Sequence, residues 1–259
     1  MLSSNSDEVG HELSGFLLEL YTYLVAVVNI TANTNLDYHS VIFDPYAETL
    51  EGFRDSNMYG SMLGCAQTLF EMIPSICKLG YRVIQDQRND TNSGEHFAEN
   101  ITAYKLLEAR ILGWQPQENA PEKDEFTSDR VIAAKIYQQS LLIFLHSNYY
   151  GSQVSDPTFL NLIDKSLEAI IPLVMLLPLD SPILTTFMWP IMIIGSCIRE
   201  PLGRGLLLGR IRDSPFNMTS ISKGIQLLEW LWEDDDPTAF GPYGLGLVMK
   251  KHNVTYCMG

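Results

Sequence analysis

The pair of residues in this sequence best suited to acid–base chemistry is His146 with Tyr149, three positions apart in the stretch FLHSNYYG. An imidazole exchanges protons near neutral pH, and a phenol beside it can donate one. If the chain is an enzyme, these two side chains are the first acid and base to consider. His146 also ends an apolar helical run, where the helix dipole favours a positive charge. We therefore interpret it as a structural histidine with satisfied ring nitrogens, and keep the catalytic role as the alternative.

Other reactive residue types show no pattern of a known site. The five histidines and four cysteines lack the spacing of a zinc ribbon, a thioredoxin-type pair or an HExxH site. The glycines of GRGLLLGR at 203–210 follow no strand and lack the GK[ST] of a phosphate loop. Cys197 lies in an apolar run, where a thiol stays protonated and unreactive. We predict no metal, no cofactor and no catalytic residue other than the alternative pair above.

A run of carboxylates, Glu233 to Asp236, stands directly before Pro237. Clustered carboxylates can hold a divalent cation. They also make an ordinary solvated end to a helix, although negative charge at a helix C-terminus opposes the helix dipole. We favour the solvated run over the cation site.

The most apolar segment, TTFMWPIMIIGSCIRE at 185–200, contains a Trp-Pro pair. Proline fits the first turn of a helix because its missing N–H would have no partner there. Pro190 therefore predicts the start of a buried helix, and Pro182 predicts the start of the element before it. Trp189 would then lie at the corner between the two, with a large apolar body and one N–H to satisfy.

Three small residues, Gly195-Ser196-Cys197, follow this corner about one and a half turns later. They allow another backbone, or a ligand, to come close. We expect a tightly packed pair of helices and keep a ligand site as the alternative, because the nearby Met and Trp side chains would also suit an apolar metabolite. In that case the pocket candidates are Trp189, Met192, Gly195, Cys197 and Trp230.

Apolar residues recur at helical spacing through most of the chain, and the two-residue period of strands is not found. Pro74 should kink or split the helical segment at 57–84. The sequence therefore predicts an all-α fold, a single irregular multi-helix domain over residues 1–259 with exposed loops near 85–96 and 115–128. Helical segments are expected at 12–31, 57–84, 97–113, 129–147, 157–176 and 217–236.

Charge and hydropathy limit the partners. The chain has 17 basic and 31 acidic residues, a formal net charge of −14, and such a chain repels nucleic acid phosphates. Prolines interrupt the apolar stretch 169–198, so that no piece approaches the ~20 residues of a spanning helix. The polar, acidic start is not a signal peptide, and the scattered cysteines fit a reduced, intracellular protein. We expect no direct nucleic acid and no membrane among the partners.

A set of motifs in the C-terminal half resembles a known family. In order these are LTTFMWPIMIIGSCIRE, Arg204, GIQLLEWLWEDDD and YGLGLVMKKHNVTYCMG. They are similar to the pattern of the fungal-specific transcription factor domain family, which has an apolar helix with Trp-Pro, a glycine before small residues, an arginine, and a later helix with a tryptophan near an acidic stretch. Segments of the N-terminal half, among them AAKIYQQSLLIFLH, also follow in the expected order. The resemblance covers most of the chain and is sharpest from Trp189 to Trp232.

This resemblance implies an α-helical regulatory domain of the kind that follows the six-cysteine zinc module of fungal transcription activators. Such domains are implicated in dimerisation, inhibition and, in some members, response to small molecules. The four cysteines of this chain cannot form a six-thiolate cluster, so the implied domain would not bind DNA by itself. Its partners would be other proteins or a second copy of itself, with an apolar small molecule as a further ligand. Its expected location is the nucleus, or otherwise the cytoplasm.

A second hypothesis is an enzyme or binding protein of small-molecule (secondary-metabolite) biosynthesis built on the same helical scaffold. Its motive is the missing zinc module in a chain that starts at Met1. A fold can be re-used in this way because function resides in sites. A pocket in which His146 and Tyr149 converge with an arginine or carboxylates would favour the enzyme. We favour the regulator.

Overall fold

The computed structural model describes residues 20, 66–89, 94–116, 127–215 and 219–254, and every regular element in these ranges is helical. The predicted all-α fold is confirmed. No helix within these ranges is long and apolar enough to cross a bilayer. The elements, in chain order, are α3 (Gln67–Phe70), α4 (Ile73–Asn89), α5 (Gly94–Leu112), α6 (Thr127–Tyr150), α7 (Pro157–Leu176), the 3-10 helix η4 (Pro182–Thr186), α8 (Met188–Cys197), α9 (Pro201–Arg212), α10 (Thr219–Glu233) and α11 (Gly241–Lys251).

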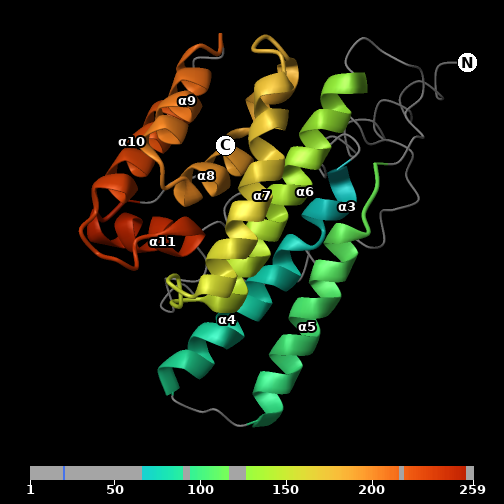
Figure 1. Ribbon diagram of the computed structural model, residues 1–259, viewed down its shortest axis with the longest axis vertical. Helices are drawn as coiled ribbons and strands as arrows, with labels where there is room; N and C mark the ends of the chain where they lie inside the picture. Colours follow the sequence, from blue (N-terminus) through green and yellow to red (C-terminus); the bar gives the residue numbers. More distant parts are fainter. Residues whose placement is uncertain (1–19, 21–65, 90–93, 117–126, 216–218, 255–259) are drawn as a thin grey trace, which may run out of the picture.

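Helix α6 forms the centre of the domain. It packs against α4, α5, α7, α8 and α11, and every residue from Leu141 to Asn148 is buried. A helix that is apolar on nearly all sides must be covered on all of them. Figure 1 shows the long helices α4 to α7 running beside one another, with α8 to α11 gathered along one side of them.

Helix α8 is the buried element of the C-terminal part, and α10 and α11 pack against it. A Cβ on Gly195 would lie 2.7 Å from Leu228 Cδ1 and 3.0 Å from Leu207 Cδ2. Only glycine therefore lets α9 and α10 come this close to α8. The indole Nε1 of Trp232 donates to the Gly195 carbonyl oxygen over 3.0 Å, which joins α10 to α8. The tightly packed helices expected at the small residues are present.

Prolines and a capping aspartate begin three of these elements. Pro182 is the first residue of η4, and Pro190 lies in the first turn of α8, as the sequence predicted. At α7, Asp156 accepts hydrogen bonds from the backbone N–H groups of Thr158 and Phe159 at 2.8 and 3.0 Å. The N–H groups of a first helical turn have no acceptor within the helix. Proline fits there because it has no N–H, and the aspartate fits because its carboxylate accepts from these groups.

The loop expected near 85–96 is largely helical instead, because α4 and α5 extend into it from its two sides. Distant residues hold the end of α4. The Gln87 amide nitrogen donates to the Tyr150 carbonyl oxygen over 3.0 Å, and its amide oxygen accepts from the Ser152 hydroxyl over 3.0 Å. The polar residues here are typical of a loop, but the hydrogen bonds of the Gln87 side chain to Tyr150 and Ser152 hold the segment against the rest of the fold. Residues 90–93 lie outside the described ranges.

Other expected segments fall wholly or partly outside the described residues. This applies to the helix at 12–31 apart from Leu20, and to most of the loop near 115–128, although α6 already begins at Thr127. Of the segment at 57–84, the part from residue 66 onward is described, and a turn there separates α3 from α4 just before proline 74. The predicted split of this segment is confirmed.

Helix α9 is an element that the helical periodicity did not predict. Its sequence holds three glycines, each of which costs about 1 kcal/mol of helix propensity relative to alanine. Two apolar side chains, Leu207 and Ile211, are buried against the rest of the domain. Tertiary packing of this face compensates for the weak local preference.

Candidate functional site

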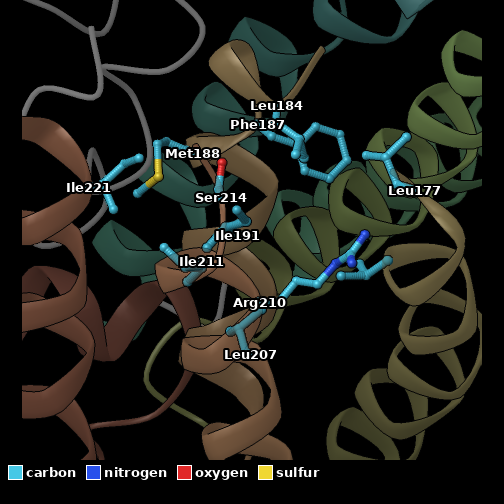
Figure 2. Close-up of a pocket in the computed structure, with 11 residues that line it drawn as sticks. Leu177, Leu184, Phe187, Met188, Ile191, Leu207, Arg210, Ile211, Ser214 and Ile221 are labelled. Atoms are coloured by element: carbon cyan, nitrogen blue, oxygen red, sulfur yellow. The ribbon is translucent and has the colours of Figure 1, made fainter. Parts of the chain in front are cut away.

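An apolar pocket opens where α7, η4, α8, α9 and α10 meet (Figure 2). Its empty space is about 480 Å³ when the part open to solvent is included, and about 30 Å³ of that is accessible to the centre of a water molecule. This water-accessible space has room for about two water molecules. The lining residues are Val174, Leu177, Leu184, Phe187, Met188, Ile191, Leu207, Arg210, Ile211, Ser214 and Ile221.

The helices around the pocket each present one apolar face to it. On α8 this face includes Met188 and Ile191, three residues apart. On α9 it includes Leu207, Arg210 and Ile211, at the three- and four-residue spacing that places side chains on one side of a helix. The lining is thus almost wholly apolar, with Arg210 as its charged member.

Arg210 brings positive charge into this apolar setting. Its Nη2 atom is buried and has no hydrogen-bond partner, and Figure 2 shows the side chain extending from α9 toward Leu177, at the end of α7. A buried donor without an acceptor costs about 1–3 kcal/mol, and more when the group is charged. Arg212, two positions further on, is instead largely exposed and pairs with Glu229 over 3.3 Å. The pocket is therefore an apolar cavity that holds an unsatisfied cationic donor.

None of the five pocket candidates from the sequence lines this pocket. Trp189, Met192 and Cys197 are buried in the core, and Gly195 is covered by α10. Trp230 lies on α10, and its ring stacks on the imidazole of His252, the residue after α11, with ring centroids 4.0 Å apart. The pocket uses a different face of the same helix α8.

The face of α8 that meets the pocket could not be read from the sequence, because the helix is apolar on every side. The ring of Trp189 faces the core, with its centroid 6.3 Å from that of Tyr137 and 5.7 Å from that of Phe144. Met188, its neighbour along the chain, points into the pocket instead. No local signal marks Arg210, since whether an arginine has a partner depends on the side chains that packing places around it.

The alternative acid–base pair is brought together with a third side chain, Tyr104 of α5. The Tyr104 hydroxyl lies 3.0 Å from His146 Nδ1 and donates to Glu108 Oε1 over 2.9 Å. Since its one proton goes to the carboxylate, the His146 Nδ1–H is the donor in the other bond. The ring of Tyr149 stacks on that of Tyr104 with centroids 4.2 Å apart. The sequence did not reveal Tyr104, which is 42 positions from His146.

Burial sets the protonation of this cluster. It lowers the pKa of His146 to about 4. It also raises the pKa of Tyr104 far above its ordinary value, and the hydrogen bond to Glu108 raises it further. His146 is therefore uncharged at neutral pH, because desolvation disfavours the imidazolium. Groups with such pKa values are poorly matched to proton transfer at neutral pH, so the cluster is best explained as a network joining α5 to α6.

The cysteines in the described residues are not activated as nucleophiles. Cys77 and Cys197 are both buried, and burial raises the pKa of each thiol to about 12. Both thiols stay protonated and inert. Cys65 and Cys257 lie outside the described ranges. In the part of the chain that the structure describes, no three His, Cys, Asp or Glu side chains are placed to hold a metal ion.

The acidic run forms a turn rather than a charged helix end. Helix α10 ends at Glu233, so the aspartates lie beyond it. The carboxylate of Asp234 accepts from the backbone N–H of Asp236 over 3.0 Å and from Lys251 Nζ over 2.9 Å. These two hydrogen bonds, the backbone one first, lower the pKa of Asp234. Of this run, Asp234 ties the end of α10 to α11 through Lys251.

Fold and site together define an all-α domain, packed around α6, whose C-terminal helices enclose a small apolar pocket with one buried cationic donor. The sequence profile of the fungal-specific transcription factor domain matches residues 3–243. Because this range is nearly the whole chain, the chain belongs to that family, and the resemblance of its motifs is confirmed. No curated protein and no solved structure was found to match the chain.

Proposed function

We propose that this chain is a regulatory domain of transcription that acts through contacts with other proteins and does not bind DNA by itself. The observation that carries the proposal is the family match over residues 3–243. The formal net charge of −14 supports the absence of direct DNA contact, because DNA binding depends on basic side chains that neutralise phosphates. Nuclear localisation is part of the proposal, since transcription is regulated there.

Exposed apolar side chains on α7 and α9 support a protein-binding role. On α9, Leu202 and Leu206 are 78% and 51% exposed, and on α7, Met175 and Leu176 are 52% and 66% exposed. Leu202 and Leu206 are four residues apart and so lie on one side of α9. These side chains belong to the two helices that flank the pocket. A partner helix could bury them, as apolar anchors commonly are at helix-in-groove interfaces.

The pocket supports a second part of the proposal, that an apolar small molecule tunes this regulator. The pocket lies between α7 and α9, the same helices that carry the exposed apolar residues. A ligand that changed the packing between them would change the surface offered to a partner. The ligand would shift the equilibrium between two packing arrangements of α7 and α9 by the difference in its binding free energy for them.

The enzyme hypothesis ranks second. One observation favours it, the partly buried hydrogen-bonded series from His146 through Tyr104 to Glu108. The pKa values of the histidine and the tyrosine are displaced away from neutrality, however, and none of the three residues lines the pocket described above. We therefore propose regulation rather than catalysis.

A reporter assay in a fungal host tests the proposal. Residues 1–259 are fused to a heterologous DNA-binding domain, and transcription from a promoter with its target site is measured. We expect the fusion to change transcription relative to the DNA-binding domain alone, and the unfused chain to show no shift of duplex DNA in a gel. A folded, nuclear fusion that leaves transcription unchanged would overturn the proposal.

Charged substitutions locate the surface. The double variant Leu202→Glu with Leu206→Glu is expected to abolish the effect on the reporter, because two carboxylates replace the apolar anchors. Leu112→Glu is the matched control, since this leucine is 57% exposed on α5. An equal loss in both variants would argue against α9 as the interface.

A further inference from the structure

We propose that the pocket between α7 and α9 binds a small apolar carboxylate, whose anionic group pairs with Arg210 and whose apolar body lies against Met188, Ile191 and Ile221. This inference deepens the proposed function by naming the chemical class of the small molecule. The binding test below uses the purified chain alone, so its outcome is independent of the reporter assay.

The charge of the ligand follows from Arg210. Its Nη2 is buried in the wall of the pocket without an acceptor. Two other arginines are paired with carboxylates, Arg199 with Asp164 and Arg212 with Glu229. Arg210 is half-buried, and a buried N–H of a charged group is costly until an acceptor completes its hydrogen bond, which an anion does most strongly. A carboxylate matches the planar geometry of the guanidinium and can accept two parallel hydrogen bonds from its N–H groups.

The apolar body of the ligand follows from the remaining lining. All of the lining residues other than Arg210 and Ser214 are apolar. An inorganic anion would leave this surface without a partner, whereas a hydrocarbon chain or ring would cover it. Met188 has the flexible, polarisable side chain that adapts to ligands of different shape.

The size of the ligand is limited by the space. Room for about two waters accommodates a carboxylate, and the hydrocarbon would lie in the part of the pocket that opens to solvent. Because the water-accessible space is small, the side chains around it would have to move apart to enclose an acid of medium chain length completely.

Isothermal titration of the purified chain with decanoate tests the proposal, with 1-decanol as the uncharged probe of equal length. We expect saturable binding of decanoate at one site and at least tenfold weaker binding of the alcohol. Arg210→Gln should weaken decanoate by roughly 10- to 100-fold, the usual effect of losing a hydrogen bond to a charged group. Arg212→Gln, two positions away on the same helix, should leave the affinity unchanged.

A second measurement covers the case in which a variant changes the fold. Because Arg210 has an unsatisfied buried donor, Arg210→Met should unfold at the same or a higher temperature than the unmodified chain when no ligand is present. Decanoate should raise the unfolding temperature of the unmodified chain and of Arg212→Gln, but not of Arg210→Met. The proposal is overturned by an absence of decanoate binding, by equal affinity for decanoate and decanol, or by full competition from inorganic phosphate.

Discussion

The stability of this domain should depend on pH through His146. The imidazole is buried and its pKa is lowered from 6.5 to about 4, with desolvation as the cause. The unfolded chain therefore takes up a proton as the pH falls through 6.5, while the folded chain does so only near 4. Between these values the unfolded state binds more protons, so the free energy of unfolding decreases as the pH falls. Above 6.5 His146 contributes no pH dependence.

The size of the effect follows from the two pKa values. They differ by about 2.5, and one pKa unit corresponds to about 1.4 kcal/mol. Protonation of His146 in the unfolded state therefore lowers the free energy of unfolding by roughly 3 kcal/mol by about pH 4. A domain of ordinary stability, about 5–15 kcal/mol, would lose a large part of it by pH 4. The hydrogen-bonded carboxylate of Asp234 acts in another range, since its pKa is lowered from 3.8 and matters only at still lower pH.

Urea unfolding followed by circular dichroism, repeated across this pH range, measures the effect. His146→Gln should be less stable than the unmodified chain at neutral pH, because it loses ring packing and the bond to Tyr104. Its free energy of unfolding should nevertheless fall much less between pH 6.5 and 4. His96→Gln is the matched control, since this histidine is exposed on α5, and it should keep the full slope. Equal slopes in His146→Gln and the unmodified chain would refute the reasoning.

Three further predictions concern packing, capping and thiol reactivity. Gly195→Ala should cost about 1–3 kcal/mol in urea unfolding, because the new Cβ would lie 2.7 Å from Leu228 Cδ1; an unchanged midpoint would mean that α10 can move away freely. Asp156→Ala should cost about 1 kcal/mol through loss of the α7 cap, whereas Asp156→Asn should cost little, and equal losses would exclude capping as the cause. Cys77 and Cys197, with pKa values of about 12, should resist iodoacetamide in the folded chain and react once it is unfolded, as site-resolved mass spectrometry would show; rapid labelling of the folded chain would contradict their burial.

The helices were largely predictable because their signals are local. The spacing of apolar residues predicted a helix at 157–176, which are the bounds of α7. The preference of proline for a first helical turn predicted that elements begin near Pro182 and Pro190. These signals act within one or two turns of the chain. Where the local preference was weak or misleading, as in glycine-rich α9 and at the end of α4 near Gln87, contacts from distant residues decided the outcome.

The sequence by itself thus determined the fold class, the family and the apolar segment on which the C-terminal core is built. Only the tertiary structure decided which face of α8 meets the core and which meets a pocket, since a helix that is apolar on all sides carries no preferred direction. It also decided that His146 is neutral and that Arg210 has a buried donor without an acceptor. Charge state and hydrogen-bond satisfaction depend on the surroundings of a side chain, and those surroundings are assembled from residues far apart along the chain.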